Sequence, residues 1–249
     1  MSDAEFPDDE IDIELRSLEE ISGRLIILAS LLRRGHLDEA DDGDDAARER
    51  FDLRHWLIDQ NIQRYATDDE GRVLDAPLGA LTPADVDDIA VTGESLVALG
   101  WAVGLVDVIP PYDRFASPAD LLATIPAPWD AAARFASGLH PRDDDVIAAE
   151  RERAELWLWR AEIEAEHLTA GGPERAEIEA VIRDTARDAV AAGLIQIHTS
   201  HDFALSGQPF RDHSAETREA IAIIAERRLH ALNWLCGFGR DWAHVPLDV

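Results

Sequence analysis

The chain of 249 residues has no lysine, a single cysteine and no long apolar run. With only Cys236 available, neither an internal disulfide framework nor a thiolate zinc site can form within one chain. The most apolar stretch, residues 25–32, is short beside the roughly 20 residues that a bilayer-spanning helix needs. No membrane segment is therefore expected. Residues 1–12 also lack the basic and then apolar pattern of a signal peptide, so we expect a soluble cytoplasmic protein.

Arginine supplies all 23 basic residues, and 51 acidic residues give a formal net charge of −28. Nucleic acid is an improbable partner, because affinity for a phosphate backbone comes mainly from cationic side chains. The absence of lysine beside many Ala and Arg residues indicates a bias toward GC-rich codons. Part of the acidity can therefore reflect the source organism, and a salt-adapted host would explain it as well.

Apolar residues recur at helical spacing along most of the chain, which predicts an all-α fold. We expect a compact bundle of roughly seven helices, with room for one short strand or hairpin where Ile195 and Ile197 alternate with polar residues. Gly35 is expected to end the first helix, and 68–81 is expected to be a loop or hairpin. The expected helical segments are 11–34, 46–66, 82–103, 118–125, 129–137, 142–169, 173–192 and 214–236.

The organisation of the chain follows from the same pattern. Residues 1–45 are expected to form an acidic tail, a helix and a solvated loop. Residues 46–249 are expected to form the main helical domain, in which two lobes could meet near 126–141, where prolines interrupt the helical pattern.

The last helix carries an arginine among its apolar positions. Placed on a helical wheel, Arg228 falls in the middle of the arc that should face the core. A buried guanidinium is costly unless it is paired, so Arg228 should have a carboxylate or several carbonyl groups as partners. Glu94, at the start of the very apolar part of the helix expected over 82–103, is the expected partner.

Glu226, His230 and Asn233 group on the opposite arc of this helix. Glu226 and His230 are one turn apart, which suits a pair of metal ligands or a base with its orienting carboxylate. An exposed face with an ion pair is the simpler interpretation, and we favour it because the two-histidine helix motif of metalloproteases is absent.

Other candidate sites are weaker. His198 and His201, next to Asp202, have a spacing compatible with a divalent metal, but nine histidines make such a coincidence common. Cys236 ends the apolar arc and is expected to be an inert buried thiol. No phosphate-binding glycine loop, dinucleotide fingerprint or Gly-x-Ser-x-Gly elbow occurs, so no cofactor is expected.

Four blocks of sequence, in order, resemble an uncharacterised and mainly bacterial family, domain of unknown function 4272. They are GESLVALGWAVGLVD at 93–107, AELWLWRAE at 154–162, DFALSGQPFRD at 202–212 and ERRLHALNWLCG at 226–237. Asp241-Trp242 and Val245-Pro246, which follow the last block, are similar to the end of the family pattern. The resemblance extends over about residues 46–249. It implies a fold, but it implies no activity, because the family has no established one.

The chain departs from the family pattern in the last helix. Where the family tends to have Glu-Arg-His, this sequence has Arg227, Arg228 and Leu229, so Glu226 and His230 are each displaced by one residue. Arg228, Asn233 and Trp234 match the pattern. If the family used the displaced carboxylate or histidine in catalysis, this chain would have lost that group.

Three functional hypotheses remain open. The first is a non-enzymatic interaction protein whose acidic surface engages a basic protein, as an immunity protein or inhibitor would. The second is a small-molecule site or enzyme between the Glu94 helix and the last helix, since polar groups in apolar surroundings are common in pockets. The third is a purely structural core. The candidate residues of the second hypothesis are Glu94, Trp101, Arg160, Arg228, Asn233 and Trp234. We favour the first slightly, on charge.

Overall fold

A computed structural model of the chain describes residues 13–39 and 43–248, and it confirms a predominantly all-α fold. The acidic tail expected at 1–10 lies outside these residues. The described part contains eight α-helices, several single 3-10 turns and one small sheet. The helices are α1 (Leu18–Asp38), α2 (Gly43–Asp59), α3 (Asp68–Asp75), α4 (Pro83–Ala102), α5 (Ala119–Leu122), α6 (Asp144–Thr169), α7 (Gly172–Ala191) and α8 (Ala215–Leu235).

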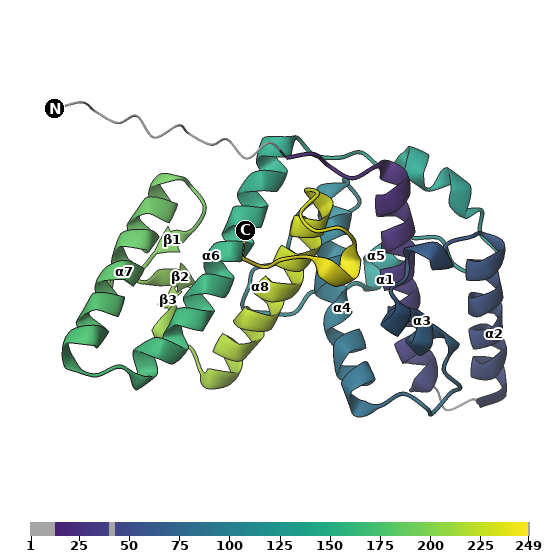
Figure 1. Cartoon of the computed structure of the whole chain (residues 1–249), viewed down its shortest axis with the longest axis horizontal. Helices are drawn as coiled ribbons and strands as arrows, with labels where there is room; N and C mark the ends of the chain where they lie inside the picture. Colours follow the sequence, from purple (N-terminus) through teal and green to yellow (C-terminus); the bar gives the residue numbers. More distant parts are fainter. Residues whose placement is uncertain (1–12, 40–42, 249) are drawn as a thin grey trace.

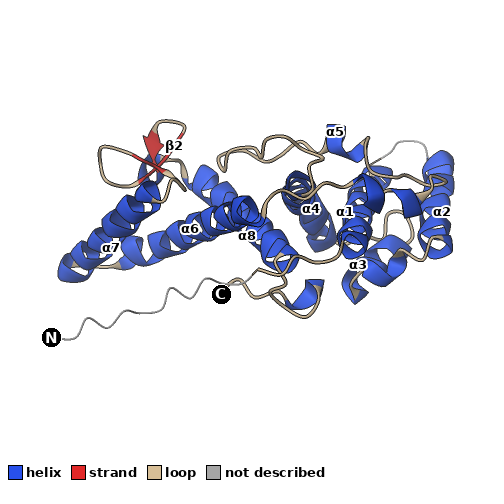
Figure 2. Ribbon diagram, turned by 90° about the horizontal axis from the view of Figure 1, so that it is seen from above, coloured by secondary structure: helices blue, strands red, loops and turns tan. Residues whose placement is uncertain are grey.

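The long helices stand side by side in an elongated molecule (Figure 1). Helix α8 packs between α6 and α4, and α4 packs in turn against α1, so that α4 and α8 lie at the centre. The view from above shows α7 and the sheet at one end of the row and α2 at the other (Figure 2). Within the described ranges, no helix is both long and apolar enough to cross a bilayer.

The central position of α4 and α8 follows from their side chains. The second half of α4, from Gly93 to Ala102, is buried at every residue, as expected for a helix that is apolar on all sides. The apolar arc of α8 is buried as well, including Ile221, Ile224 and Leu232. The groove described below lies on one side of these two helices. The Glu94–Arg228 contact lies between them.

Reciprocal side-chain caps fix where three helices begin. Ser17 and Glu20 form a capping box at the start of α1, and Thr82 and Asp85 form one at the start of α4. Thr67 with Glu70 does the same for α3, where the loop or hairpin expected at 68–81 is wrong in part. The Ser/Thr-x-x-Glu spacing at residue 67 was the overlooked signal.

Gly35 does not end the first helix, contrary to expectation. Helix α1 continues to Asp38, because Gly35 is a contact point between helices and not a terminus. A Cβ atom added there would lie 2.7 Å from Cγ2 of Ile89 on α4, so the missing side chain lets the two helices approach. The loop expected over 36–45 is correspondingly shorter, because α2 begins at Gly43.

The structure changes one prediction for the irregular segments and extends another. The helix expected over 129–137 is reduced to two 3-10 turns, at Ala132–Arg134 and Ala136–Gly138, and a division into two lobes nearby stays a prediction. The short strand expected at Ile195–Ile197 is confirmed and belongs to a larger unit. Strand β1 (Gln196–Ile197) pairs with β2 (Phe203–Leu205), and β2 pairs with β3 (Gln208–Pro209), all antiparallel.

Candidate functional site

The ion pair predicted between the two central helices is present. Nε of Arg228 donates to Oε2 of Glu94 at 2.9 Å, and the two side chains are 0% and 1% exposed. A second guanidinium nitrogen donates to the Pro110 carbonyl at 2.6 Å. The other Glu94 oxygen accepts from the backbone N–H of Ala116. The buried charge is therefore matched by an acid and a carbonyl group, as the sequence required.

This pair continues into a packed polar core and does not open into a pocket. The Arg228 guanidinium lies 4.6 Å from the centre of the Tyr112 ring, and the Tyr112 hydroxyl donates to Glu150 at 3.0 Å. Burial raises the pKa of Glu150, although Arg153 beside it acts in the opposite direction. The arrangement is that of a structural network, since Glu94 and Arg228 pair across two helices and Glu150 contacts Tyr112 and, on its own helix, Arg153.

Arg160, a predicted site residue, lies in a different buried cluster. Its guanidinium holds Asp202 through two hydrogen bonds of 2.7 and 3.0 Å and also donates to Glu164. Arg211 donates to the same Asp202 carboxylate, and the two arginines lower the pKa of Asp202 against the effect of its burial. The ring of Phe210 stacks beneath Arg160. This cluster ties the small sheet to α6.

The metal candidates in that region do not converge. Asp202 faces the two arginines, whereas the His198 ring contacts Ser200 and His201 is exposed. Among the residues that the structure describes, no group of three or more His, Cys, Asp and Glu side chains could hold a metal ion.

Two further predicted residues have structural partners. Asn233 is fully buried, accepts from Arg151 at 2.6 Å and donates to the Pro246 carbonyl at 2.8 Å, which ties the C-terminal segment to α8. Trp101 is buried in α4 under the Arg142 guanidinium. Of the six predicted residues, the structure brings Glu94 and Arg228 together, and it places only Trp234 at the groove described next.

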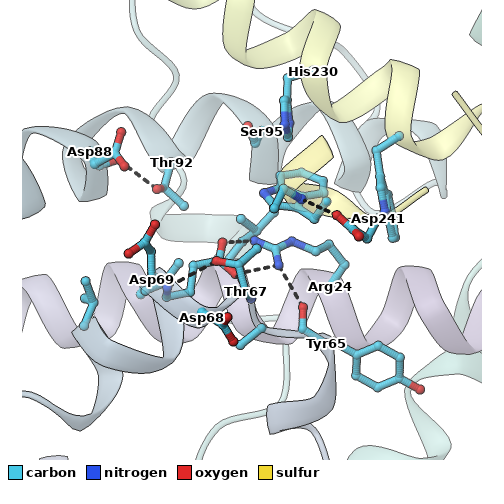
Figure 3. Close-up of a pocket in the computed structure, with 18 of the residues that line it drawn as sticks. Arg24, Tyr65, Thr67, Asp68, Asp69, Asp88, Thr92, Ser95, His230 and Asp241 are labelled. Atoms are coloured by element: carbon cyan, nitrogen blue, oxygen red, sulfur yellow. Dashed lines mark hydrogen bonds and ion pairs between the residues drawn. The ribbon is translucent and has the colours of Figure 1, made fainter. Parts of the chain in front are cut away.

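That groove lies between α1, α3, the part of α4 from Ala84 to Ser95, one face of α8 and the C-terminal segment, and its volume is about 1190 Å³ (Figure 3). Helix α4 contributes Asp88, Thr92 and Ser95, while α8 contributes Arg227 and His230. Although it is formed by the two helices named in the sequence-based hypothesis, it uses their other faces. The groove is large enough for a small organic ligand.

The charges that line the groove are nearly balanced. Six arginines and seven carboxylates line it, in a chain whose net charge is −28. Each of these arginines lies next to an acid, for example Arg72 with Asp85 at 2.6 Å and Arg227 with Asp88 at 2.5 Å. The groove therefore holds six of the 23 arginines of this acidic protein, each beside a carboxylate.

A buried arginine and an indole ring form one wall. Arg24 of α1 is 1% exposed, forms an ion pair with Glu70 of α3 and donates to the Tyr65 carbonyl at 2.9 Å (Figure 3). The Trp242 ring covers its guanidinium, with 4.0 Å between the guanidinium carbon and the ring centre. Trp242 also packs edge-on against Trp234 at 5.3 Å. The cation–π contact fixes the C-terminal segment across α1.

His230 extends from α8 into this wall. Its ring packs edge-on to Trp242, with 4.6 Å between ring centres. Burial lowers the pKa of His230 to about 4, and the positive charges of Arg24 and Arg227 act in the same direction. His230 is therefore neutral at pH 7 and offers hydrogen bonding without charge. Glu226, its expected partner, is exposed on the same helix.

Most of the groove escaped the sequence-based prediction. The polar arc of α8 was a usable signal, since His230 was singled out there. Arg24 and Trp242 gave none, because they are separated by more than two hundred positions and meet only when the C-terminal segment folds across α1.

Comparison with known proteins gives a family and no activity. No curated protein and no solved structure was found to match the chain. The matched family region, residues 2–170, includes the blocks at 93–107 and 154–162 but not the two C-terminal blocks at 202–212 and 226–237. It also begins well before residue 46, where the resemblance was expected to start. The chain belongs to the family described as domain of unknown function (DUF4272).

Proposed function

We propose that the chain is a ligand-binding protein and that the groove beside His230 and Trp242 binds a small polar molecule without net charge. The observation that carries this proposal is the near balance of six arginines and seven carboxylates in a groove of about 1190 Å³. The remainder of the chain is strongly acidic. The proposal keeps the expected pair of helices, α4 and α8, but moves the site to their other faces.

The charge pattern supports an uncharged ligand. An anion entering the groove would meet seven carboxylates and the negative field of the whole chain. A cation would meet carboxylates that already have arginine partners, such as Asp85 and Asp88. A molecule with several hydroxyl or amide groups can instead use the free lone pairs and N–H groups of these pairs without separating them.

The uncharged polar groups in the groove fit the same ligand class. Thr92 and Ser95 each donate their hydroxyl hydrogen to a backbone carbonyl group, which leaves their oxygen atoms as acceptors. His230 is neutral, and Trp234 and Trp242 supply aromatic surface. The neutral His230 ring can bind polar groups of a ligand. The indole rings beside it can pack against the apolar faces of the same molecule.

The test is a thermal-shift screen with three sets of small molecules that are matched in size: uncharged polyols and amides, anions, and cations. We expect stabilising hits in the uncharged set, because a ligand that binds only the folded protein raises the melting temperature. Affinity of each hit is then measured by calorimetry on Thr92→Trp, whose indole would occupy part of the groove. Val181→Trp, on the exposed face of α7, is the matched control.

Loss of binding in Thr92→Trp, with binding kept in Val181→Trp, is the expected result. Hits confined to the anions or the cations would contradict the proposed ligand class. Hits that bind Thr92→Trp as tightly as the unmodified chain would contradict the proposed site.

A second candidate function is an acidic interaction protein that engages a basic protein partner, with no role for nucleic acid. It is supported by where the charges lie. Among the described residues, five arginines and five carboxylates are buried, so the internal charges balance. The whole excess of −28 therefore belongs to the rest of the chain, where it can attract a cationic surface.

This second candidate is tested by affinity purification from the source organism at low and moderate salt. A stoichiometric basic partner, bound more weakly as salt rises, is expected from screened charge attraction. Recovery of no basic protein at either salt concentration would contradict it.

A further inference from the structure

A large aromatic side chain projects into solvent from a rigid turn at the α1–α2 end of the molecule. Trp129 is 66% exposed, and its backbone has a φ of +76°. Bulky residues rarely adopt this left-handed conformation, because it strains the backbone. Trp129 thus combines an unfavourable backbone with an exposed apolar ring.

Hydrogen bonds from two helices hold the turn in this shape. The Arg33 guanidinium of α1 donates to the carbonyl groups of Leu122, Ile125 and Pro126 at 2.9, 2.8 and 2.7 Å. On the other side of the turn, the Trp56 indole of α2 donates to the carbonyl group of residue 130 at 2.9 Å. The turn is anchored before and after Trp129, so its backbone cannot relax without breaking these contacts.

Within the part of the chain that the structure describes, no aromatic or core contact of the Trp129 ring offsets this strain. No ring pair and no cation–π contact of Trp129 is found in the part of the chain that the structure describes. The side chain is also absent from the packed core. Exposed tryptophans on rigid backbones have the properties of binding hot spots, because they bury much apolar area on contact and lose little conformational entropy.

We propose that Trp129 is the anchor of a protein-binding surface at the end of the molecule formed by α1, α2 and the turn at 126–130. The partner is a basic protein with an apolar pocket that takes the indole ring. This inference rests on the second candidate function and assigns it a place on the surface.

Charge complementarity gives the partner its chemistry. Asp52 and Asp59 lie one helical turn before and after Trp56 on α2, and so share the side of the helix that faces the turn. Asp130, next to Trp129, is exposed. Together with the overall charge of −28, these carboxylates favour a cationic rim around the pocket. A membrane surface fits poorly, because anionic headgroups would be repelled.

The experiment places a benzophenone photo-cross-linking residue at exposed position 131, beside an intact Trp129, or, as a control, at position 181 on α7, in the full chain expressed in the source organism. Val181 is also exposed, and its helix, α7, lies at the opposite end of the molecule (Figure 1). The captured protein is then purified and titrated with the unmodified chain, Trp129→Ala and Val181→Ala. Melting temperature and binding to anionic lipid vesicles are measured in parallel.

We expect a basic protein cross-linked at 131 and not at 181, and an affinity that falls about 30-fold or more in Trp129→Ala, as for a hot-spot tryptophan. Val181→Ala should bind as the unmodified chain does. Trp129→Gly should melt within about 2 °C of the unmodified chain or above it, because glycine adopts a positive φ without strain.

Four results would overturn the inference. They are an affinity unchanged in Trp129→Ala, capture of an acidic protein or of nothing specific to position 131, vesicle binding that depends on Trp129, and a Trp129→Gly melting temperature more than about 2 °C below that of the unmodified chain. If affinity purification yields a basic partner whose binding ignores Trp129, the inference fails while the second candidate function stands. If no basic partner is recovered at all, the candidate function itself fails.

Discussion

Arg228 on α8 and Glu94 on α4 form a fully buried ion pair, with 2.9 Å between Nε and Oε2. The contact joins the two central helices of the molecule. Removing one partner leaves the other charged and buried, which is far more costly than removing both.

Glu94→Leu and Arg228→Met, made singly, are each expected to lower the free energy of unfolding by about 3–5 kcal/mol. Replacing the pair together, as Glu94→Leu with Arg228→Met, should cost much less than the two single changes added. Chemical denaturation of the four proteins measures this. Asp184→Ala, which removes an exposed ion pair with Arg187 on α7, is the control and should change stability by at most about 1 kcal/mol. Additive effects of the two core changes would contradict the account.

His230 should make stability depend on pH. Its pKa is lowered to about 4 in the folded chain from an ordinary 6.5, so the unfolded chain binds the proton more readily. The stability that the neutral ring provides is complete above pH 6.5 and is lost as pH falls toward 4. Its largest contribution is about 3 kcal/mol at pH 7.

His230→Gln tests this expectation, because glutamine keeps a polar side chain that does not titrate. Between pH 7 and 4, the free energy of unfolding should fall more steeply in the unmodified chain than in the variant. Equal slopes in the two proteins would show that the ring is not held neutral between Arg24 and Arg227.

The effect of Gly35→Ala on stability should change sign when Ile89 is also replaced. In the unmodified chain, Gly35→Ala places a Cβ atom 2.7 Å from Cγ2 of Ile89, and the overlap should cost about 1–3 kcal/mol. In an Ile89→Ala background the overlap is absent. There the same change should stabilise the chain by up to about 1 kcal/mol, because alanine favours a helix over glycine. A stabilising effect in both backgrounds would mean that Gly35 is not a contact point.

Cys236 should react slowly in the folded protein. Burial raises its pKa to about 11 from an ordinary 9, so near neutral pH the reactive thiolate is about 100-fold scarcer than in an unburied thiol. A thiol reagent that gives a coloured product should label the unfolded chain quickly and the folded chain slowly. Equal rates in buffer and in denaturant would contradict the burial of this residue at the end of α8.

The Glu94–Arg228 pair and the groove show how far the sequence alone reaches. The pair was predictable because a charge at an apolar position of α8 demands a partner, and few acids lie in comparably apolar surroundings. The contact of Arg24 with Trp242 was not predictable. Its two residues lie on distant segments, and neither segment has a local sequence pattern that points to the other. The prediction that Gly35 ends a helix was wrong for a related reason. A glycine that ends a helix and one that admits a neighbouring helix look the same in one sequence.

The most direct test of the ligand-binding groove is to locate a bound ligand. Backbone amide signals of the chain, assigned by nuclear magnetic resonance, are followed while the best uncharged hit is added. The account predicts shifts at Thr92, His230 and Trp242, with the α7 signals unchanged. Shifts confined to α7 or to the small sheet, with the His230 and Trp242 signals unmoved, would contradict it.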